Sequence, residues 1–404
     1  MENNTTKNIP IQLFNKVPEV TLFFWIIKGL CTTVGETFAD FLNVNLNFGL
    51  TGTSITIGLI LAATLFFQFR AKRYVPAIYW IAVVFISVFG TLVTDNLTDK
   101  MGVRLETSTI LFFVLLLLTF VIWYVNEKTL SIHSIFTQRR EFFYWLTILF
   151  TFALGTASGD LIAEGLGLGY LNTGIIVTTV IAIVIAAQKL KLNNVLSFWI
   201  IYIMTRPLGA SIGDYLSQPN KYVGLGLGAT ITSIVFLLGI LGIILYFTFT
   251  KRDVITKNIT EDKQDAEDKH LVLQSLITVA LFIVLGFSAY FWRHNQLQKQ
   301  SREQSIITNQ KISSSKLGDL SIFKKITEDT KTLVLSNNMN EAKYRIADLE
   351  HEWDIAQAKL KPMDRVKWAE VDDAIDKVLR QLRTINPVQK NCVSSLVNLI
   401  AILK

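Results

Sequence analysis

The sequence contains one pattern four times, first as WIIKGLCTTVGETFAD at residues 25–40. A glycine follows the tryptophan after nine intervening residues, and an aspartate follows the glycine after four more. The same W-x9-G-x4-D spacing recurs at residues 80–95, 145–160 and 199–214. The repeated residues are Trp25, Trp80, Trp145 and Trp199; Gly35, Gly90, Gly155 and Gly209; and Asp40, Asp95, Asp160 and Asp214. Four identical spacings indicate an internal repeat.

Each copy lies in an apolar stretch, and a second apolar stretch follows it. A helix needs about 20 apolar residues to cross a bilayer. The stretches that approach this length are 20–42, 51–68, 75–96, 107–125, 142–163, 170–188, 195–216, 222–248 and 271–292. With 51% hydrophobic and 18% charged residues, the chain does not have the composition of a soluble protein. We predict an all-α polytopic membrane bundle of eight spans, arranged as four parallel helical hairpins, plus a ninth span and a small C-terminal helical bundle.

Basic residues predict the orientation of the spans. Loops on the N-terminal side carry eight lysines and arginines, whereas loops on the opposite side carry three. The eight are Arg70, Lys72, Arg73, Lys128, Arg139, Arg140, Lys189 and Lys191, and the three are Lys100, Arg104 and Lys221. Because basic residues favour the cytoplasmic side, we expect a cytoplasmic N-terminus, a multi-pass location in the bacterial inner membrane, and a C-terminal domain that is periplasmic or extracellular.

The chain divides into six predicted segments. These are a cytoplasmic N-terminal segment at 1–16, the eight-span membrane domain at 17–248, a cytoplasmic linker at 249–270, the ninth transmembrane helix at 271–292, a polar tether at 293–317 and an extracytoplasmic helical domain at 318–404. Apolar residues at three- and four-residue spacing predict helices within 346–360 and 368–382. Asp364, which follows Pro362, is a natural N-cap for the second of these helices.

The chain resembles a family of bacterial integral membrane proteins built from four tandem two-span repeats of unknown function, each with a characteristic tryptophan. Trp25, Trp80, Trp145 and Trp199 match that tryptophan, and the resemblance covers about residues 17–248. It implies the repeated architecture and no established activity.

A polar stripe runs along the first helix of each repeat. Residues eight, four and zero positions before the aspartate share one face of a helix. They are Thr32, Glu36 and Asp40; Ser87, Thr91 and Asp95; Phe152, Thr156 and Asp160; and Arg206, Ala210 and Asp214. Carboxylates inside a span are costly and usually pair, bind cations or transfer protons. We therefore expect Glu36, Asp40, Asp95, Asp160, Asp214, Thr32, Thr91 and Thr156 to bind an ion or substrate.

Other interpretations of these residues are structural. Glycines and hydroxyl residues allow membrane helices to pack closely, and the tryptophans are typical of an interfacial belt. The aspartates are also consistent with helix-end carboxylates in the headgroup region. Two basic residues, Lys28 and Arg206, lie on the same helices. We expect Glu36 or Asp40 to pair with one of them across the bundle, as a counter-charge or a gate.

The sequence supports two functional hypotheses. Carboxylate and hydroxyl oxygens suit hard cations, so the first is a secondary transporter or exporter for a divalent metal or a proton-coupled solute. The second is a non-catalytic membrane scaffold or sensor that anchors the C-terminal domain to a protein partner. Nucleotide-binding and hydrolase motifs are absent, and neither Cys31 nor Cys392 belongs to a cysteine cluster. We therefore expect no enzyme activity, no cofactor and no nucleic-acid partner; the identity of any bound metal is left open.

Two acidic groups mark the C-terminal domain. They are Glu350, Glu352 and Asp354, and Asp372, Asp373 and Asp376. Such groups are most often solvated faces, although carboxylates could also bind a cation there.

Overall fold

The computed structural model describes residues 15–45, 49–218, 224–254, 271–307, 317–361, 363–384 and 386–403. Its long helices are α1 (Leu22–Asp40), α2 (Gly49–Arg70), α3 (Pro76–Asp95), α4 (Leu105–Glu127), α5 (Gln138–Asp160), α6 (Gly169–Lys189), α7 (Asn194–Ser217), α8 (Gly228–Thr250), α10 (Leu271–Ile307), α11 (Ser321–Leu335), α12 (Met339–Leu360), α13 (Arg365–Arg383) and α14 (Gln389–Ile402). Most of the predicted N-terminal segment and linker, with Lys221 and Pro362, lie outside the described residues.

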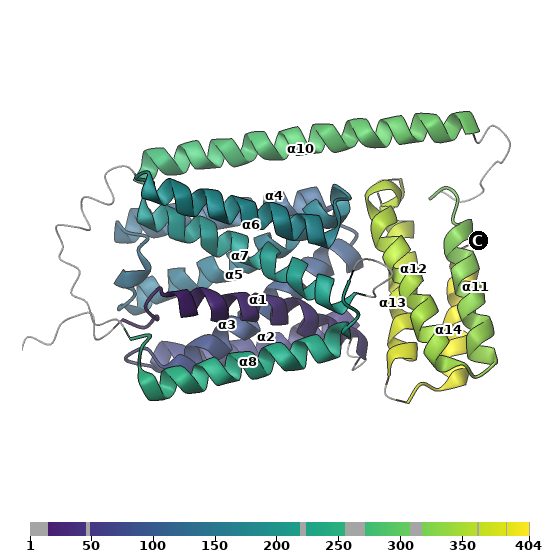
Figure 1. Cartoon of the computed structure of the whole chain (residues 1–404), viewed down its shortest axis with the longest axis horizontal. Coiled ribbons are helices and arrows are strands. Elements are labelled where there is room, and N and C mark those ends of the chain that lie inside the picture. Colours follow the sequence, from purple (N-terminus) through teal and green to yellow (C-terminus); the bar gives the residue numbers. More distant parts are fainter. Residues whose placement is uncertain are drawn as a thin grey trace, which may run out of the picture.

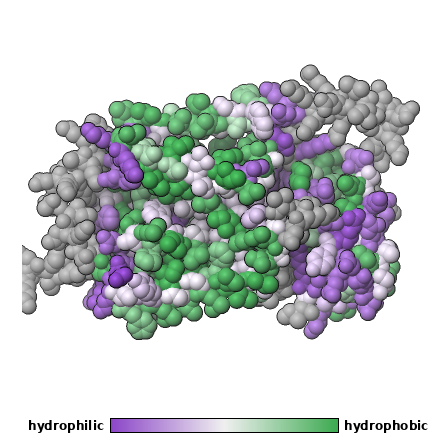
Figure 2. Space-filling view, viewed as in Figure 1, coloured by the Kyte–Doolittle hydropathy of each residue, from purple (hydrophilic) through white to green (hydrophobic). Residues whose placement is uncertain are grey.

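Nine of the described helices, α1–α8 and α10, are long and apolar enough to cross a membrane. Hydrophobic side chains cover the flank of this bundle, whereas hydrophilic ones gather on the C-terminal helices (Figure 2). The predicted all-α, polytopic architecture is therefore confirmed: the protein is a multi-pass membrane protein with a C-terminal helical domain.

The membrane bundle has an inner and an outer layer. The inner layer is a closed ring in which α1 packs on α3, α3 on α5, α5 on α7 and α7 on α1. Between 56% and 67% of the residues in their apolar segments are buried, against 17–28% for α2, α4, α6 and α8. Each outer helix packs on the inner helix of the following repeat, and α8 packs on α1. The repeats therefore follow one another around a central axis, with the first of each helix pair inside.

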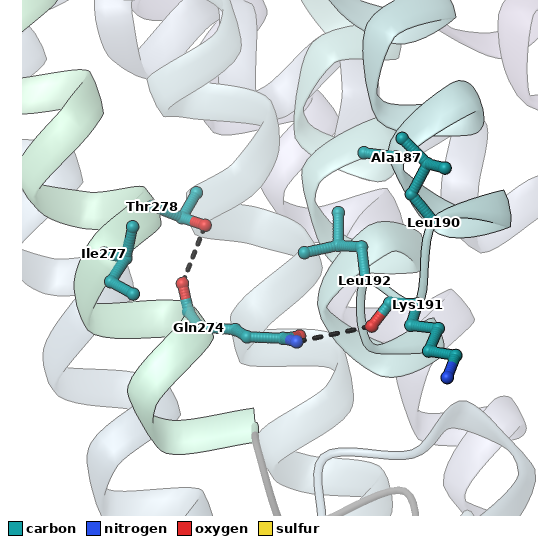
Figure 3. A pocket seen from close by; sticks show the side chains of 7 residues that line it. All are labelled: Ala187, Leu190, Lys191, Leu192, Gln274, Ile277 and Thr278. Atoms are coloured by element: carbon teal, nitrogen blue, oxygen red, sulfur yellow. Dashed lines mark hydrogen bonds between the residues drawn. The ribbon is translucent and has the colours of Figure 1, made fainter.

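Helix α10 lies alongside the bundle and leads from one end of it to the other (Figure 1). Only 6% of the residues in its apolar segment are buried. Near its start, Gln274 Oε1 accepts from the Asn193 backbone N–H at 2.8 Å, and Gln274 Nε2 donates to the Lys191 carbonyl at 3.3 Å. A pocket of about 270 Å³ separates α10 from the α6–α7 turn beside these contacts (Figure 3). Further along the helix, where the predicted span ends, Arg293 Nε donates to the Gly165 carbonyl at 3.1 Å.

The predicted tether at 293–317 is wrong over its first part. Helix α10 continues to Ile307. Residues 293–307 contain no glycine or proline and are rich in glutamine, lysine, arginine and glutamate, which are good helix formers. Residues 308–316 lie outside the described part of the chain.

Helices α11–α14 form the C-terminal domain around two stacked tryptophans. The rings of Trp353 and Trp368 lie 5.7 Å apart with an interplanar angle of 13°. Asp364 caps α13 as expected, since its carboxylate accepts from the Lys367 backbone N–H at 3.0 Å. Helices α12 and α13 lie across the end of the bundle at which α1, α3, α5 and α7 end (Figure 1). The domain thereby covers one end of the membrane bundle.

Candidate functional site

The motif glycines are contact points between neighbouring inner helices. A methyl group on Gly35 would lie 2.7 Å from Ser87 Cβ, and one on Gly90 would lie 2.9 Å from Phe152 Cβ. The same relationship joins Gly155 to Arg206 and Gly209 to Thr32. In every case the contacting residue stands eight positions before the aspartate of the next repeat around the ring, and the first repeat follows the fourth. The spacing thus encodes a ring of four equivalent helix contacts, which only glycine permits.

An aromatic cluster fills the opposite end of the inner ring. Trp80, Trp145 and Trp199 are only 1–4% exposed, so the interfacial-belt interpretation is wrong for them; Trp25 is half-buried. Each motif tryptophan contacts an aromatic residue of the preceding repeat, namely the one directly before that repeat's own tryptophan. For Trp25 the preceding repeat in the ring is the fourth. These pairs are Phe24–Trp80 at 5.5 Å, Tyr79–Trp145 at 5.4 Å, Tyr144–Trp199 at 6.3 Å and Phe198–Trp25 at 5.6 Å between ring centroids. This preceding aromatic was not predicted from the sequence, although it is present in all four copies.

A buried ion pair lies near the axis. Arg206 Nη2 is 2.6 Å from Glu36 Oε2, as expected, and the two side chains are 1% and 13% exposed. Arg206 also donates to the Thr32 carbonyl at 3.1 Å and to the Thr91 hydroxyl. This guanidinium therefore joins three of the four repeats.

Lys28 is buried but is not the counter-charge that the sequence suggested. No carboxylate among the described residues pairs with it. Its Nζ donates to the Tyr202 carbonyl at 3.1 Å and to Thr205 Oγ1 at 2.6 Å. The ammonium also lies 3.8 Å from the ring centroid of Tyr202 and 4.9 Å from that of Phe152. Backbone, hydroxyl and π-electron contacts stabilise the charge instead.

The three threonines of the stripe are fully buried within the helix contacts. Thr32 Oγ1 donates to the Gly29 carbonyl at 2.7 Å, Thr91 Oγ1 to the Gly35 carbonyl at 3.3 Å, and Thr156 Oγ1 to the Phe152 carbonyl at 3.0 Å. These contacts favour the packing interpretation over direct ligand binding.

The four motif aspartates, here called the aspartate ring, lie at the end of the inner helices that faces the C-terminal domain. In the first three repeats the α-helix ends at the aspartate and continues as a π-helical turn: η2 (Phe41–Asn45), η3 (Asn96–Lys100) and η5 (Leu161–Gly165). All four aspartates are half-buried, and they lie within electrostatic range of one another. None of their side-chain carboxylates forms an ion pair or hydrogen bond with a described residue. Within the described ranges, no group of three or more His, Cys, Asp or Glu residues is close enough to hold a metal ion.

Two further carboxylates lie in this region, and neither was predicted from the sequence. Asp99 and Glu164 stand four residues after Asp95 and Asp160, so they continue the acidic stripe by one more helical turn. Lys361 Nζ of the C-terminal domain lies 3.8 Å from Asp99 Oδ1, and Gln357 Nε2 donates to Glu164 Oε2 at 2.9 Å. The stripe therefore extends to the surface that contacts the C-terminal domain.

The acidic groups of the C-terminal domain are not simply solvated faces. Asp354, Asp372 and Asp376 are half-buried and lie within electrostatic range of membrane-domain carboxylates. Burial and neighbouring carboxylates raise the pKa of Asp354 and Asp372. Burial is also the main cause that raises the pKa of Asp376 to about 7. Their helices pack against the π-helical turns, which the sequence pattern alone does not reveal.

Comparison with known proteins gives a family and no function. The DUF347 repeat, described as a repeat of unknown function, matches residues 23–74, 78–129, 143–191 and 197–253, which together make up more than half of the chain. These segments coincide with the four helical hairpins. No curated protein and no solved structure matches the chain. The expected resemblance is confirmed, and the protein belongs to the DUF347 family of repeats of unknown function.

Proposed function

We propose that this protein is a secondary transporter or exporter for a cation, either a divalent metal or a proton-coupled solute. The observation that supports this best is the aspartate ring: four half-buried carboxylates surround one axis, and no described residue neutralises them by an ion pair. Carboxylates in this position are costly unless they bind a cation or a proton. The ring and Glu36 are the proposed binding or relay groups.

The packing along the axis suggests how the proposed binding site becomes accessible from one side of the membrane and then from the other. The aromatic cluster and the glycine contacts fill the bundle from its N-terminal end to the level of Arg206. We therefore take this conformation to be closed on that side. Passage through the bundle requires the inner helices to separate at Arg206, and breaking its pair with Glu36 is the step we assign to gating.

We also propose where the two ends of the bundle lie in the cell. The N-terminus lies in the cytoplasm of a bacterium, the aspartate ring faces the other side of the inner membrane, and no reaction is catalysed. Cysteines at Lys72 and Lys377, both exposed, test this orientation by labelling intact cells with a membrane-impermeant thiol reagent. Labelling at position 377 only is expected; labelling at position 72 only contradicts the orientation.

The scaffold or sensor remains the second candidate, because the motif glycines hold neighbouring inner helices in close contact. In that case the aspartates only help the C-terminal domain to dock and recruit a protein partner.

One experiment separates the two candidates. Cells that express the protein, Asp40→Asn or Asp160→Asn are challenged with manganese, magnesium or calcium, and their total metal content is measured. Proton flux into proteoliposomes is followed in parallel with a pH-sensitive dye. Asp329→Asn is the matched control, since this carboxylate lies in an ion pair on the C-terminal domain, 45% exposed. A flux that only the ring variants lose supports transport, whereas folded protein without any flux favours the scaffold.

A further inference from the structure

The C-terminal domain contacts the aspartate end of the bundle through one face of α12. Glu350, Asp354, Gln357 and Lys361 follow one another at four-, three- and four-residue spacing, so they share that face. Gln357 binds Glu164 of η5, and Lys361 lies near Asp99 of η3. Helix α13 contacts η2 and η3. The domain therefore rests on the π-helical turns of three repeats at once.

Both sides of this contact are predominantly acidic. The membrane side presents Asp40, Asp95, Asp99, Asp160, Glu164 and Asp214, and the domain side presents Glu350, Asp354, Asp372 and Asp376. Two of the nearby basic residues already pair inside the domain, Arg383 with Glu350 at 2.5 Å and Arg380 with Asp376 at 3.2 Å. Like charges across an interface weaken it, and the attraction between the two parts comes from Lys361 beside Asp99 and from Arg383 within electrostatic range of Asp40.

A second attachment runs through α10. Arg293 of α10 donates to the carbonyl of Gly165, the residue next to Glu164. The turn η5 thus receives Arg293 from the ninth helix and Gln357 from α12, while Tyr170 Oη donates to the other Glu164 oxygen at 2.8 Å. Turn η5 is therefore contacted by both α10 and α12.

We propose that the C-terminal domain is an autoinhibitory cap: docked by Lys361 on Asp99 and by Gln357 on Glu164, it closes the aspartate end of the bundle and must open for exchange with that side of the membrane. Its polar and repulsive interface suits an element that opens, because domains move relative to each other unless a large apolar interface holds them. The consequence for transport rests on the proposed function, whereas the docking itself does not.

Accessibility of the aspartate ring tests the cap without any measurement of transport. Asp95→Cys, in a background with Cys31→Ala and Cys392→Ala, is labelled with a membrane-impermeant thiol reagent. Lys361→Glu places a carboxylate beside Asp99, and Lys377→Glu makes the same charge change at an exposed position of α13. We expect labelling at least tenfold faster with Lys361→Glu and unchanged with Lys377→Glu. Equal rates in all three proteins would overturn the proposal, and Asp160→Cys repeats the test if Asp95→Cys does not fold.

A cross-link tests whether the ring stays inaccessible when the domain is held in its docked position. Gln357→Cys and Glu164→Cys, oxidised with copper phenanthroline, join the two parts covalently. The cap is supported if the cross-link slows labelling of the ring and abolishes any flux, and if a reductant restores both. A cross-linked protein that is labelled or transports as fast as the reduced one contradicts it. If the parent protein transports nothing, the labelling arms still decide the matter.

Discussion

Gly209 of α7 lies directly against Thr32 of α1, and this contact closes the ring of inner helices. A methyl group on Gly209 would come within 2.5 Å of Thr32 Cβ. The contact joins the last repeat to the first, and it is equivalent to the contacts between consecutive repeats. Four copies therefore close the ring, because Thr32 of the first repeat packs against the motif glycine of the fourth.

Enlarging this glycine should open the ring. We expect Gly209→Ala to lower the free energy of unfolding by about 1–3 kcal/mol, as overpacking of a core does. Gly29→Ala is the control, since a methyl group on Gly29 of the same α1 meets no atom within 4 Å. Thermal unfolding in detergent measures both; an equal effect of the two changes would contradict the ring of contacts.

The Glu36–Arg206 pair should behave as a coupled unit. Arg206→Met leaves a buried carboxylate without its partner, which costs about 3–5 kcal/mol. The double variant Glu36→Gln/Arg206→Met removes both charges, and we expect it to recover most of that loss. A double-mutant cycle from thermal or denaturant unfolding measures the coupling, and additive effects would show that the pair contributes nothing beyond its separate side chains.

The aromatic cluster should contribute to stability rather than to membrane anchoring. Trp80 is 1% exposed and donates through Nε1 to Tyr74 Oη at 3.1 Å. We expect Trp80→Ala to destabilise the protein by about 3–5 kcal/mol. Trp292→Ala is the matched control on α10, where the tryptophan is 48% exposed. If both variants unfold at the same temperature, burial of the repeated tryptophans is not what stabilises the bundle.

Docking of the cap should weaken as the pH rises. The pKa of Asp376 in the docked state is about 7, well above the value of about 3.9 for an exposed aspartate. The docked state therefore binds more protons, so this contribution to docking is present below about pH 4 and is lost as the pH rises through about 7. Groups around Asp376 are Glu350 on α12, Asp372, Asp373, Arg380 and Arg383 on α13, Asp99 on η3 and Asp40 on α1.

Spin labels at Lys100→Cys and Val366→Cys, both exposed, report the distance between the two parts. With Cys31 and Cys392 replaced, we expect a longer distance above pH 7 than at pH 5. Asp376→Asn should reduce this change because it removes one titrating group. A distance that is constant over this range would contradict the prediction.

Several features followed from local pattern and were predicted well. Nine apolar stretches, the four W-x9-G-x4-D repeats and the Asp364 cap depend on side-chain type and short-range order. The pairing of Glu36 with Arg206 also followed, because a buried charge requires a partner. The prediction of a tether was wrong at 293–307, because good helix formers extend α10 beyond its apolar segment. The predicted role of Lys28 was wrong because carbonyl, hydroxyl and aromatic groups contact its ammonium in place of the expected carboxylate.

The sequence by itself determined that the chain forms four parallel membrane hairpins with a carboxylate at the same level in each. Periodicity and hydropathy are local properties, so they specify helices, spans and repeated positions. Only the tertiary structure decided which residue each motif glycine touches, that three of the four motif tryptophans are buried in protein, and that α12 and α13 cover the aspartate ring. These depend on contacts between residues far apart in the chain, such as Gly209 with Thr32 and Lys361 with Asp99, and packing free energy selects among such contacts only when all the helices are present together.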